Sequence, residues 1–163
     1  MPTLSAGQVW SGPPIDGLAP DAWRNDPEVA RLAGMAASRA VPADKLEAEL
    51  QGFAGAAGST ERLTLLFGGI FHSVQAERTR AMEAIRRFAR SQRALADRIA
   101  GHVALLETLP PDDPGRAAAA EAMHWDRRLL EDRARLLPVL CDSPVMLERR
   151  LGAAARLLAA RLE

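Results

Sequence analysis

Arginine is the residue type with the clearest capacity for chemistry in this sequence of 163 residues. Twenty of the 21 basic residues are arginine, and seven of them lie between positions 78 and 98, against only Glu83 and Asp97. A planar guanidinium offers paired N–H donors to carboxylates and phosphates. Six of these arginines project over one broad arc of a helix, opposite its apolar side: Arg80, Arg86, Arg87, Arg90, Arg93 and Arg98. This arginine face predicts a binding surface for an acidic protein or a nucleic acid.

Three interpretations of the arginine face stay open. The simplest is a solvated face with ion pairs to a neighbouring helix, because a later segment carries Glu121, Asp126, Glu131 and Asp132. The second is an acidic protein partner. The third is nucleic acid, whose binding would weaken steeply with salt. No aromatic residue alternates with the arginines to stack on bases, so nucleic acid comes last.

A second candidate binding surface is apolar and lies near the N-terminus. Residues 1–20 are rich in proline, glycine and serine and follow no hydrophobic period, which predicts an extended or disordered tail. The tail nevertheless contains Trp10, Ile15 and Leu18, and Trp23 follows shortly after it. We expect this segment to dock on a protein partner. The alternative is that it folds back onto the chain's own helices.

The remaining reactive residues lack the spacing that catalysis or metal binding needs. His102 and His124 would approach each other near the end of a hairpin, but no Glu-x-x-His or His-x-x-x-His pair supports a metal site. Cys141 is the single cysteine, follows an apolar stretch and is expected to be buried. Glycine-rich phosphate-binding motifs and a nucleophile elbow are absent from the sequence. We therefore expect no catalytic residue, no metal and no cofactor.

A long helix must position the arginine face. Residues 59–109 contain no proline, and Ser59 is a suitable N-cap. The Gly68-Gly69 pair predicts a bend or a close contact. From Val74 onward, mostly apolar positions recur in alternating steps of four and three, the spacing of a coiled-coil seam. The seam positions are Val74, Arg78, Ala81, Ile85, Phe88, Gln92, Leu95, Ile99, His102 and Leu106.

The chain should then turn at residues 110–115 and return as a second helical segment. Asp113 is the expected cap of the returning helix. Pro138 predicts a kink, and Ser143-Pro144 predicts a new start, so we expect two helices, 114–141 and 144–162. The face expected to pack on the first arm contains Ala118, Ala122, Trp125, Leu129, Leu136 and Leu140.

The first part of the chain predicts two shorter helices, at 26–40 and 43–53. Asp26 followed by Pro27 is a typical helix start. The run from Leu63 to Phe71 is apolar on more than one side, so it needs a cover from these helices, from the last helix or from a second copy.

The sequence therefore predicts an all-α fold. We expect a long antiparallel helical hairpin over residues 59–163, whose coiled-coil arm turns near 110–115. A small helical bundle at the base of this hairpin would include the short helices of 21–58. Residues 1–20 would form the tail.

The expected function is a non-enzymatic interaction protein, an adaptor or scaffold subunit of a larger bacterial complex. Its protein partners, some of them acidic, would be contacted through Trp10, Ile15, Leu18, Trp23, Arg80, Arg86, Arg87, Arg90 and Arg93. The alternative is a nucleic-acid-associated helical protein, and homo-oligomerisation stays open. One cysteine, no visible secretory signal and no apolar run of about 20 residues predict a soluble, cytoplasmic protein without membrane contact.

Overall fold

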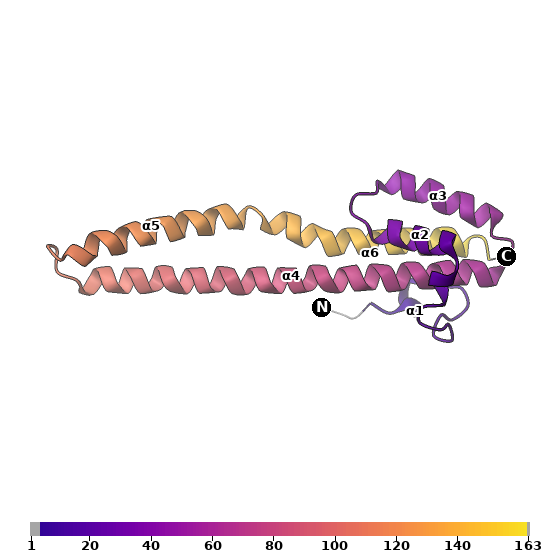
Figure 1. Ribbon diagram of the computed structural model, residues 1–163, viewed down its shortest axis with the longest axis horizontal. Coiled ribbons are helices and arrows are strands. Elements are labelled where there is room, and N and C mark those ends of the chain that lie inside the picture. Colours follow the sequence, from indigo (N-terminus) through magenta and orange to yellow (C-terminus); the bar gives the residue numbers. More distant parts are fainter. Residues whose placement is uncertain (1–3, 163) are drawn as a thin grey trace. The chain divides into compact units, whose positions relative to one another are not determined.

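The computed structural model describes residues 4–162, and its regular elements are all helical (Figure 1). They are, in chain order, α1 (Ala6–Val9), the 3₁₀ helix η1 (Ala22–Asn25), α2 (Pro27–Ala37), α3 (Ala43–Ala56), α4 (Thr60–Thr108), α5 (Pro114–Ala134) and α6 (Leu137–Ala159). No β-strand occurs in the described range. The predicted all-α class is confirmed.

The chain divides into two compact units. Of the described residues, unit 1 contains 4–80 and 143–162, and unit 2 contains 81–142. Helices α4 and α6 each contribute to both units.

The short helices of unit 1 begin where the local chemistry predicts. The Asp26 side chain accepts hydrogen bonds from the backbone N–H groups of Glu28 (3.0 Å) and Val29 (3.2 Å), which caps α2. Helix α2 ends at Ala37, earlier than expected. Helix α3 continues past its glycines to Ala56, because the burial of residues such as Phe53 outweighs the roughly 1 kcal/mol that each glycine costs.

The apolar run of α4 is the centre of unit 1. Leu66, Phe67 and Ile70 are completely buried. They share one hydrophobic cluster with side chains of α2, such as Leu32, and of α6, such as Leu151. The chain's own helices therefore cover this run.

The N-terminal segment, described from residue 4, packs on α4 and is not an extended tail. The Trp10 ring stacks on Phe67 with the centroids 4.2 Å apart and the planes 6° from parallel. Trp10 and Ile15 are each only 7% exposed. The composition of this segment predicted disorder, but stacking and apolar burial fix it on the helix.

The Gly68-Gly69 pair provides the close contact rather than an interruption of α4. A Cβ atom at Gly69 would lie 3.1 Å from the Trp23 ring, and one at Gly68 would lie 3.1 Å from the Leu18 side chain. Helix α4 runs through both positions without a break. The pair therefore lets the N-terminal segment approach the helix backbone.

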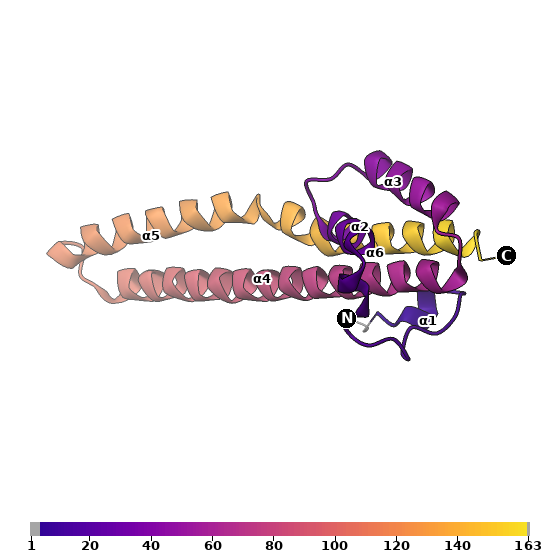
Figure 2. The same cartoon turned by 45° about the vertical axis from the view of Figure 1, so that its right-hand side comes forward.

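Unit 2 pairs the second half of α4 with α5 in opposite directions, around a turn at 109–113 (Figures 1 and 2). The Asp113 carboxylate accepts a 2.7 Å hydrogen bond from Gly115 N–H and caps α5 as predicted. The Arg116 guanidinium donates to the backbone carbonyls of Leu106 (2.6 Å) and Leu109 (2.9 Å). These bonds satisfy carbonyl groups that the end of α4 leaves without helical partners.

The predicted seam of α4 is protected from solvent. All ten seam positions are buried or half-buried. Leu95, in unit 2, is 3% exposed, and the Gln92 amide donates to the Leu130 carbonyl of α5 at 3.5 Å. The heptad spacing thus identified the protected side of α4, on which Gln92 contacts α5 whereas Val74 and Arg78 lie in unit 1. A supercoil of the two helices stays a prediction.

The predicted inner face of the returning segment is wrong for three of its large residues. Trp125, Leu129 and Leu136 are 58%, 39% and 54% exposed. The small Ala119 is buried instead, and Asp126 forms an ion pair with Arg98 of α4. A charged hydrogen-bonded contact and a small residue that permits close approach decide the rotation of α5 here.

The predicted division of the return segment at residues 142–143 is also wrong. Helix α5 ends at Ala134 and α6 begins at Leu137. Pro138 has no N–H to donate to the Ala134 carbonyl, and its ring disfavours helical geometry at the preceding residue. Pro144, in contrast, lies inside α6 without dividing it.

Candidate interaction surface

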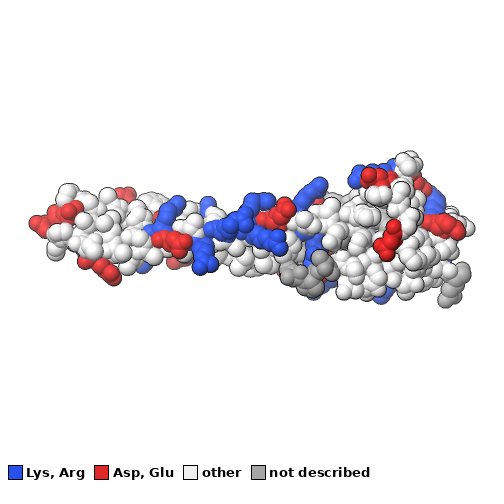
Figure 3. All heavy atoms as spheres, turned by 90° about the horizontal axis from the view of Figure 1, so that it is seen from below, with Lys and Arg blue, Asp and Glu red and all other residues white. Residues whose placement is uncertain are grey.

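Four arginines of unit 2 form the most distinctive polar surface of the described structure. We define the arginine row as Arg86, Arg87, Arg90 and Arg93. All four are exposed on α4, and they stand away from the seam residues that face α5. Figure 3 shows basic side chains gathered over the middle of α4 with a few acidic ones among them, and acidic side chains at the end near the 109–113 turn.

The arginine row has few partners within the chain. Arg87 Nη1 lies 4.0 Å from Glu83 Oε2, a long and solvent-exposed pair that contributes little. Within residues 4–162, Arg86, Arg90 and Arg93 form no ion pair. Arg80 lies in unit 1 and pairs with Glu77 at 2.9 Å, so it is not part of the row.

The expected ion pairs between the arginine face and α5 are limited to one arginine. Arg98 donates two hydrogen bonds to the Asp126 carboxylate, at 2.5 and 3.1 Å. These bonds lower the pKa of Asp126 and raise the pKa of Arg98. Asp132 lies 3.8 Å from Arg135, the residue that follows the end of α5. The carboxylates of α5 therefore leave the arginine row available to an external anion.

The apolar residues predicted to bind a partner lie within unit 1. Trp10, Ile15 and Trp23 are buried, and Leu18 is half-buried against the same core. The Trp23 indole N–H donates to the Pro20 carbonyl at 3.1 Å. This position agrees with the alternative that the segment folds back on the chain. Docking on a partner would require it to leave α4.

The histidines and the cysteine form no reactive group. His102 Nε2 lies 3.6 Å from Asp126, and His124 contacts Trp125 edge-on. No cluster of three metal-ligating side chains exists in the part of the chain that the structure describes. Cys141 is exposed, so its expected burial is wrong. The apolar residues beside it, such as Val139, are exposed as well.

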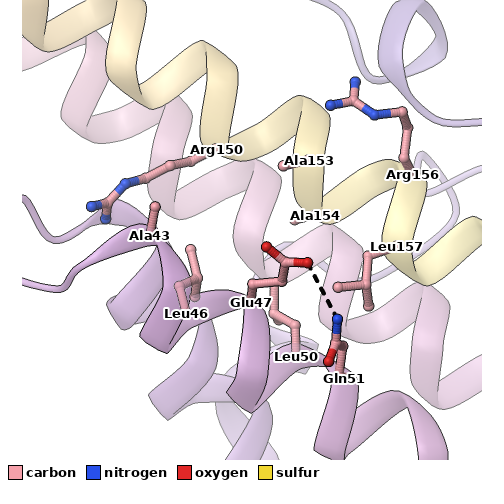
Figure 4. A pocket seen from close by; sticks show the side chains of 10 residues that line it. All are labelled: Ala43, Leu46, Glu47, Leu50, Gln51, Arg150, Ala153, Ala154, Arg156 and Leu157. Atoms are coloured by element: carbon pink, nitrogen blue, oxygen red, sulfur yellow. Dashed lines mark hydrogen bonds between the residues drawn. The ribbon is translucent and has the colours of Figure 1, made fainter.

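A cavity of about 510 Å³ lies between α3 and α6 in unit 1 (Figure 4). Leu46, Leu50 and Leu157 contribute apolar surface. Its Glu47 carboxylate accepts a 3.2 Å hydrogen bond from Gln51. The Arg150 guanidinium donates to two backbone carbonyls of the loop between α2 and α3. None of the ten lining residues is Ser, Cys or His, so the cavity offers no nucleophile paired with a base.

These features define an all-α protein with a helical pair that presents an exposed basic row. No protein family, no curated protein and no solved structure matches the chain. Among residues 4–162, no helix combines the length and the apolar character needed to cross a membrane.

Proposed function

We propose that the protein is a non-enzymatic interaction protein, an adaptor or scaffold subunit of a larger complex, which binds an acidic protein partner through the arginine row. One observation carries the proposal: the row projects four guanidinium groups into solvent, and the described chain supplies only one distant carboxylate to them. Guanidinium groups form strong paired hydrogen bonds with carboxylates.

The dimensions of the row favour a helical protein over a nucleic acid. Arg86, Arg90 and Arg93 follow the spacing of one helix side and extend over roughly 10 Å at 1.5 Å per residue. A partner helix with carboxylates at the same spacing would match them. Nucleic acid is the second candidate, but acidic residues around the turn, including Asp112 and Asp113, would repel a longer run of phosphates.

The test compares the wild type with the triple variant R86E/R90E/R93E. Affinity purification from nuclease-treated cells of the source organism, followed by mass spectrometry, identifies proteins retained by the wild type. Direct titration with the purified partner then measures affinity. We expect the triple variant to lose about 100-fold or more in affinity, since like charges would then face each other across the contact.

The matched control is R149E/R156E/R161E, which changes the net charge equally on exposed arginines of unit 1. It should retain the partner. Equal retention of the partner by both triple variants would exclude the row as the contact. A gel shift with duplex DNA at low salt, lost only in R86E/R90E/R93E, would favour the nucleic-acid alternative.

A further inference from the structure

A serine of unit 2 lies where an arginine of the returning helix has no negative charge to pair with. The Arg133 guanidinium of α5 donates a 2.8 Å hydrogen bond to the Ser91 hydroxyl of α4. Among residues 4–162, no carboxylate forms an ion pair with Arg133. The contact between the two helices is therefore a cation opposite a neutral hydroxyl.

The equivalent position two helical turns away holds a complete ion pair. Ser91 lies seven residues before Arg98 on α4, and Arg133 lies seven residues after Asp126 on α5. At that second position the Asp126 carboxylate accepts hydrogen bonds from Arg98, at 2.5 and 3.1 Å. Because the helices are antiparallel, the two contacts have the same register. A negative group on Ser91 would complete the first contact as Asp126 completes the second.

A second arginine shares the side of α4 on which Ser91 lies. Arg87 precedes Ser91 by four residues, the spacing of neighbours on a helix surface. Its ion-pair partner in the described chain, Glu83, is exposed and 4.0 Å away. A phosphate on Ser91 would thus meet one guanidinium from each helix. Guanidinium groups form paired, charge-assisted hydrogen bonds with phosphate oxygens.

We propose that Ser91 is a phosphorylation site, whose phosphate binds Arg133 and Arg87 and turns off the arginine row. A protein serine kinase transfers the γ-phosphoryl group of ATP. The bond from Ser91 Oγ to phosphorus forms and the bond from phosphorus to the β–γ bridging oxygen breaks. ADP leaves, and the hydroxyl proton passes to the catalytic base of the kinase.

The effect on the arginine row follows from charge. The phosphate adds about 1.5 to 2 negative charges at pH 7, directly beside Arg90 and close to Arg87 and Arg93. It neutralises part of the row and repels an acidic partner. This regulatory effect rests on the proposed function, whereas the contact between the phosphate and Arg133 does not.

The surroundings of Ser91 fit a kinase whose substrate groove is acidic. Ser91 is exposed, and residues 84–96 contain four arginines and no carboxylate. A kinase binds its acceptor as an extended segment, so this part of α4 must open locally. Among the described residues, Leu95 and Ala119 are the buried hydrophobic residues of unit 2, and so small a core lowers the free energy of opening.

Phosphoserine incorporated at position 91 during translation tests the contact without a kinase or a partner. Amide hydrogen exchange across residues 85–95 and 128–134 should slow about tenfold relative to the unmodified chain. In Arg133→Gln the same phosphate should slow exchange less than about threefold. Arg127→Gln is the matched control, an exposed arginine of the same helix, and should keep the full effect. Equal slowing in Arg133→Gln, or faster exchange in the phosphorylated wild type, would overturn the contact.

Mass spectrometry of the protein isolated from its source organism, with phosphatases inhibited, tests the modification itself. We expect phosphate on the peptide that contains Ser91, and Ser91→Ala should remove this signal. A Ser91 that stays unmodified in growing, stationary and starved cells would overturn the inference.

Titration with the purified partner tests the regulatory effect. Phosphoserine at position 91 should weaken binding about tenfold or more, whereas Ser91→Ala should bind like the wild type. If the arginine row is not the contact, R86E/R90E/R93E keeps the partner while the phosphate still slows exchange. If the triple variant loses a partner that the phosphorylated chain still binds with wild-type affinity, the row is the contact and its regulation by Ser91 is refuted.

Discussion

At the scale of single residues, Asp126 links the two helices of unit 2. Hydrogen bonds from Arg98 hold the pKa of Asp126 below its usual value, so the ionised carboxylate stabilises the folded unit above about pH 4. This contribution is lost as the pH falls through the lowered pKa. We expect Asp126→Asn to lower stability at pH 7 and to match the wild type at about pH 2, where both side chains are neutral.

Urea unfolding followed by circular dichroism at both pH values measures this effect. Asp132→Asn is the control, because among the described residues Asp132 pairs with Arg135, three positions along the chain, at 3.8 Å and not with α4. An equal loss of stability for Asp126→Asn at pH 7 and pH 2 would show that the side chain acts through packing and not through its charge.

Two glycines of α4 should respond in opposite directions to the same substitution. A Cβ atom at Gly69 would already lie 3.1 Å from the Trp23 ring, whereas nothing lies within 4 Å of one at Gly101. Gly69→Leu should therefore destabilise unit 1 by about 1–3 kcal/mol through overpacking. Gly101→Leu should stabilise the helix by about 0.5–1 kcal/mol. Urea unfolding measures the change in stability of each variant. Similar changes for the two variants would contradict the packing of the Trp23 ring against Gly69.

At the scale of elements, Pro138 separates α5 from α6. Alanine at this position would supply the missing N–H to the Ala134 carbonyl, so Pro138→Ala should join the two helices. Amide exchange at residues 134–138 should then slow by about tenfold or more. Pro144→Ala is the control, since Pro144 already lies inside α6 and should leave exchange at 134–138 unchanged. If amide exchange stayed unchanged in Pro138→Ala, tertiary contacts rather than the proline would cause the break between α5 and α6.

Local chemistry made the helix starts and the α4 seam predictable from sequence. Asp26 and Asp113 cap their helices as expected, and the Ser59 hydroxyl accepts a 3.2 Å hydrogen bond from the Arg62 N–H. Each cap depends on a few neighbouring residues. The heptad spacing similarly specifies one side of a helix whatever covers it. The exposed arginine row followed from the same spacing, because it lies opposite the seam.

Contacts between distant segments could not be predicted in this way. A helical wheel shows that Trp125 and Leu129 share a side of α5, but it does not state which neighbour covers that side. The composition of residues 1–20 indicated disorder, because nothing local reveals that the Trp10 ring stacks on Phe67 or that Gly68 leaves room for the Leu18 side chain. The same limit applies to the predicted arginine face, in which Arg98 is the one of the six arginines that pairs with a carboxylate of α5 in the described structure.

At the scale of the whole molecule, the two units differ in how much apolar surface they bury. The largest completely buried side chains, such as Phe67 and Leu151, belong to unit 1. In unit 2, Leu95 and Ala119 are the buried hydrophobic residues among those that the structure describes. Local opening requires less free energy where fewer apolar contacts are lost. We therefore expect unit 2 to open before unit 1.

Leu95→Ala tests this difference directly. Removing a buried leucine side chain costs about 2–5 kcal/mol, and in unit 2 that loss affects its one large buried hydrophobic residue. Hydrogen exchange measured by mass spectrometry should accelerate across residues 85–134 and stay unchanged across residues 60–74. Leu151→Ala should instead accelerate exchange in residues 60–74, because Leu151 shares their cluster. If Leu95→Ala accelerated both regions equally, the two units would unfold as one, because α4 would transmit the loss along its whole length.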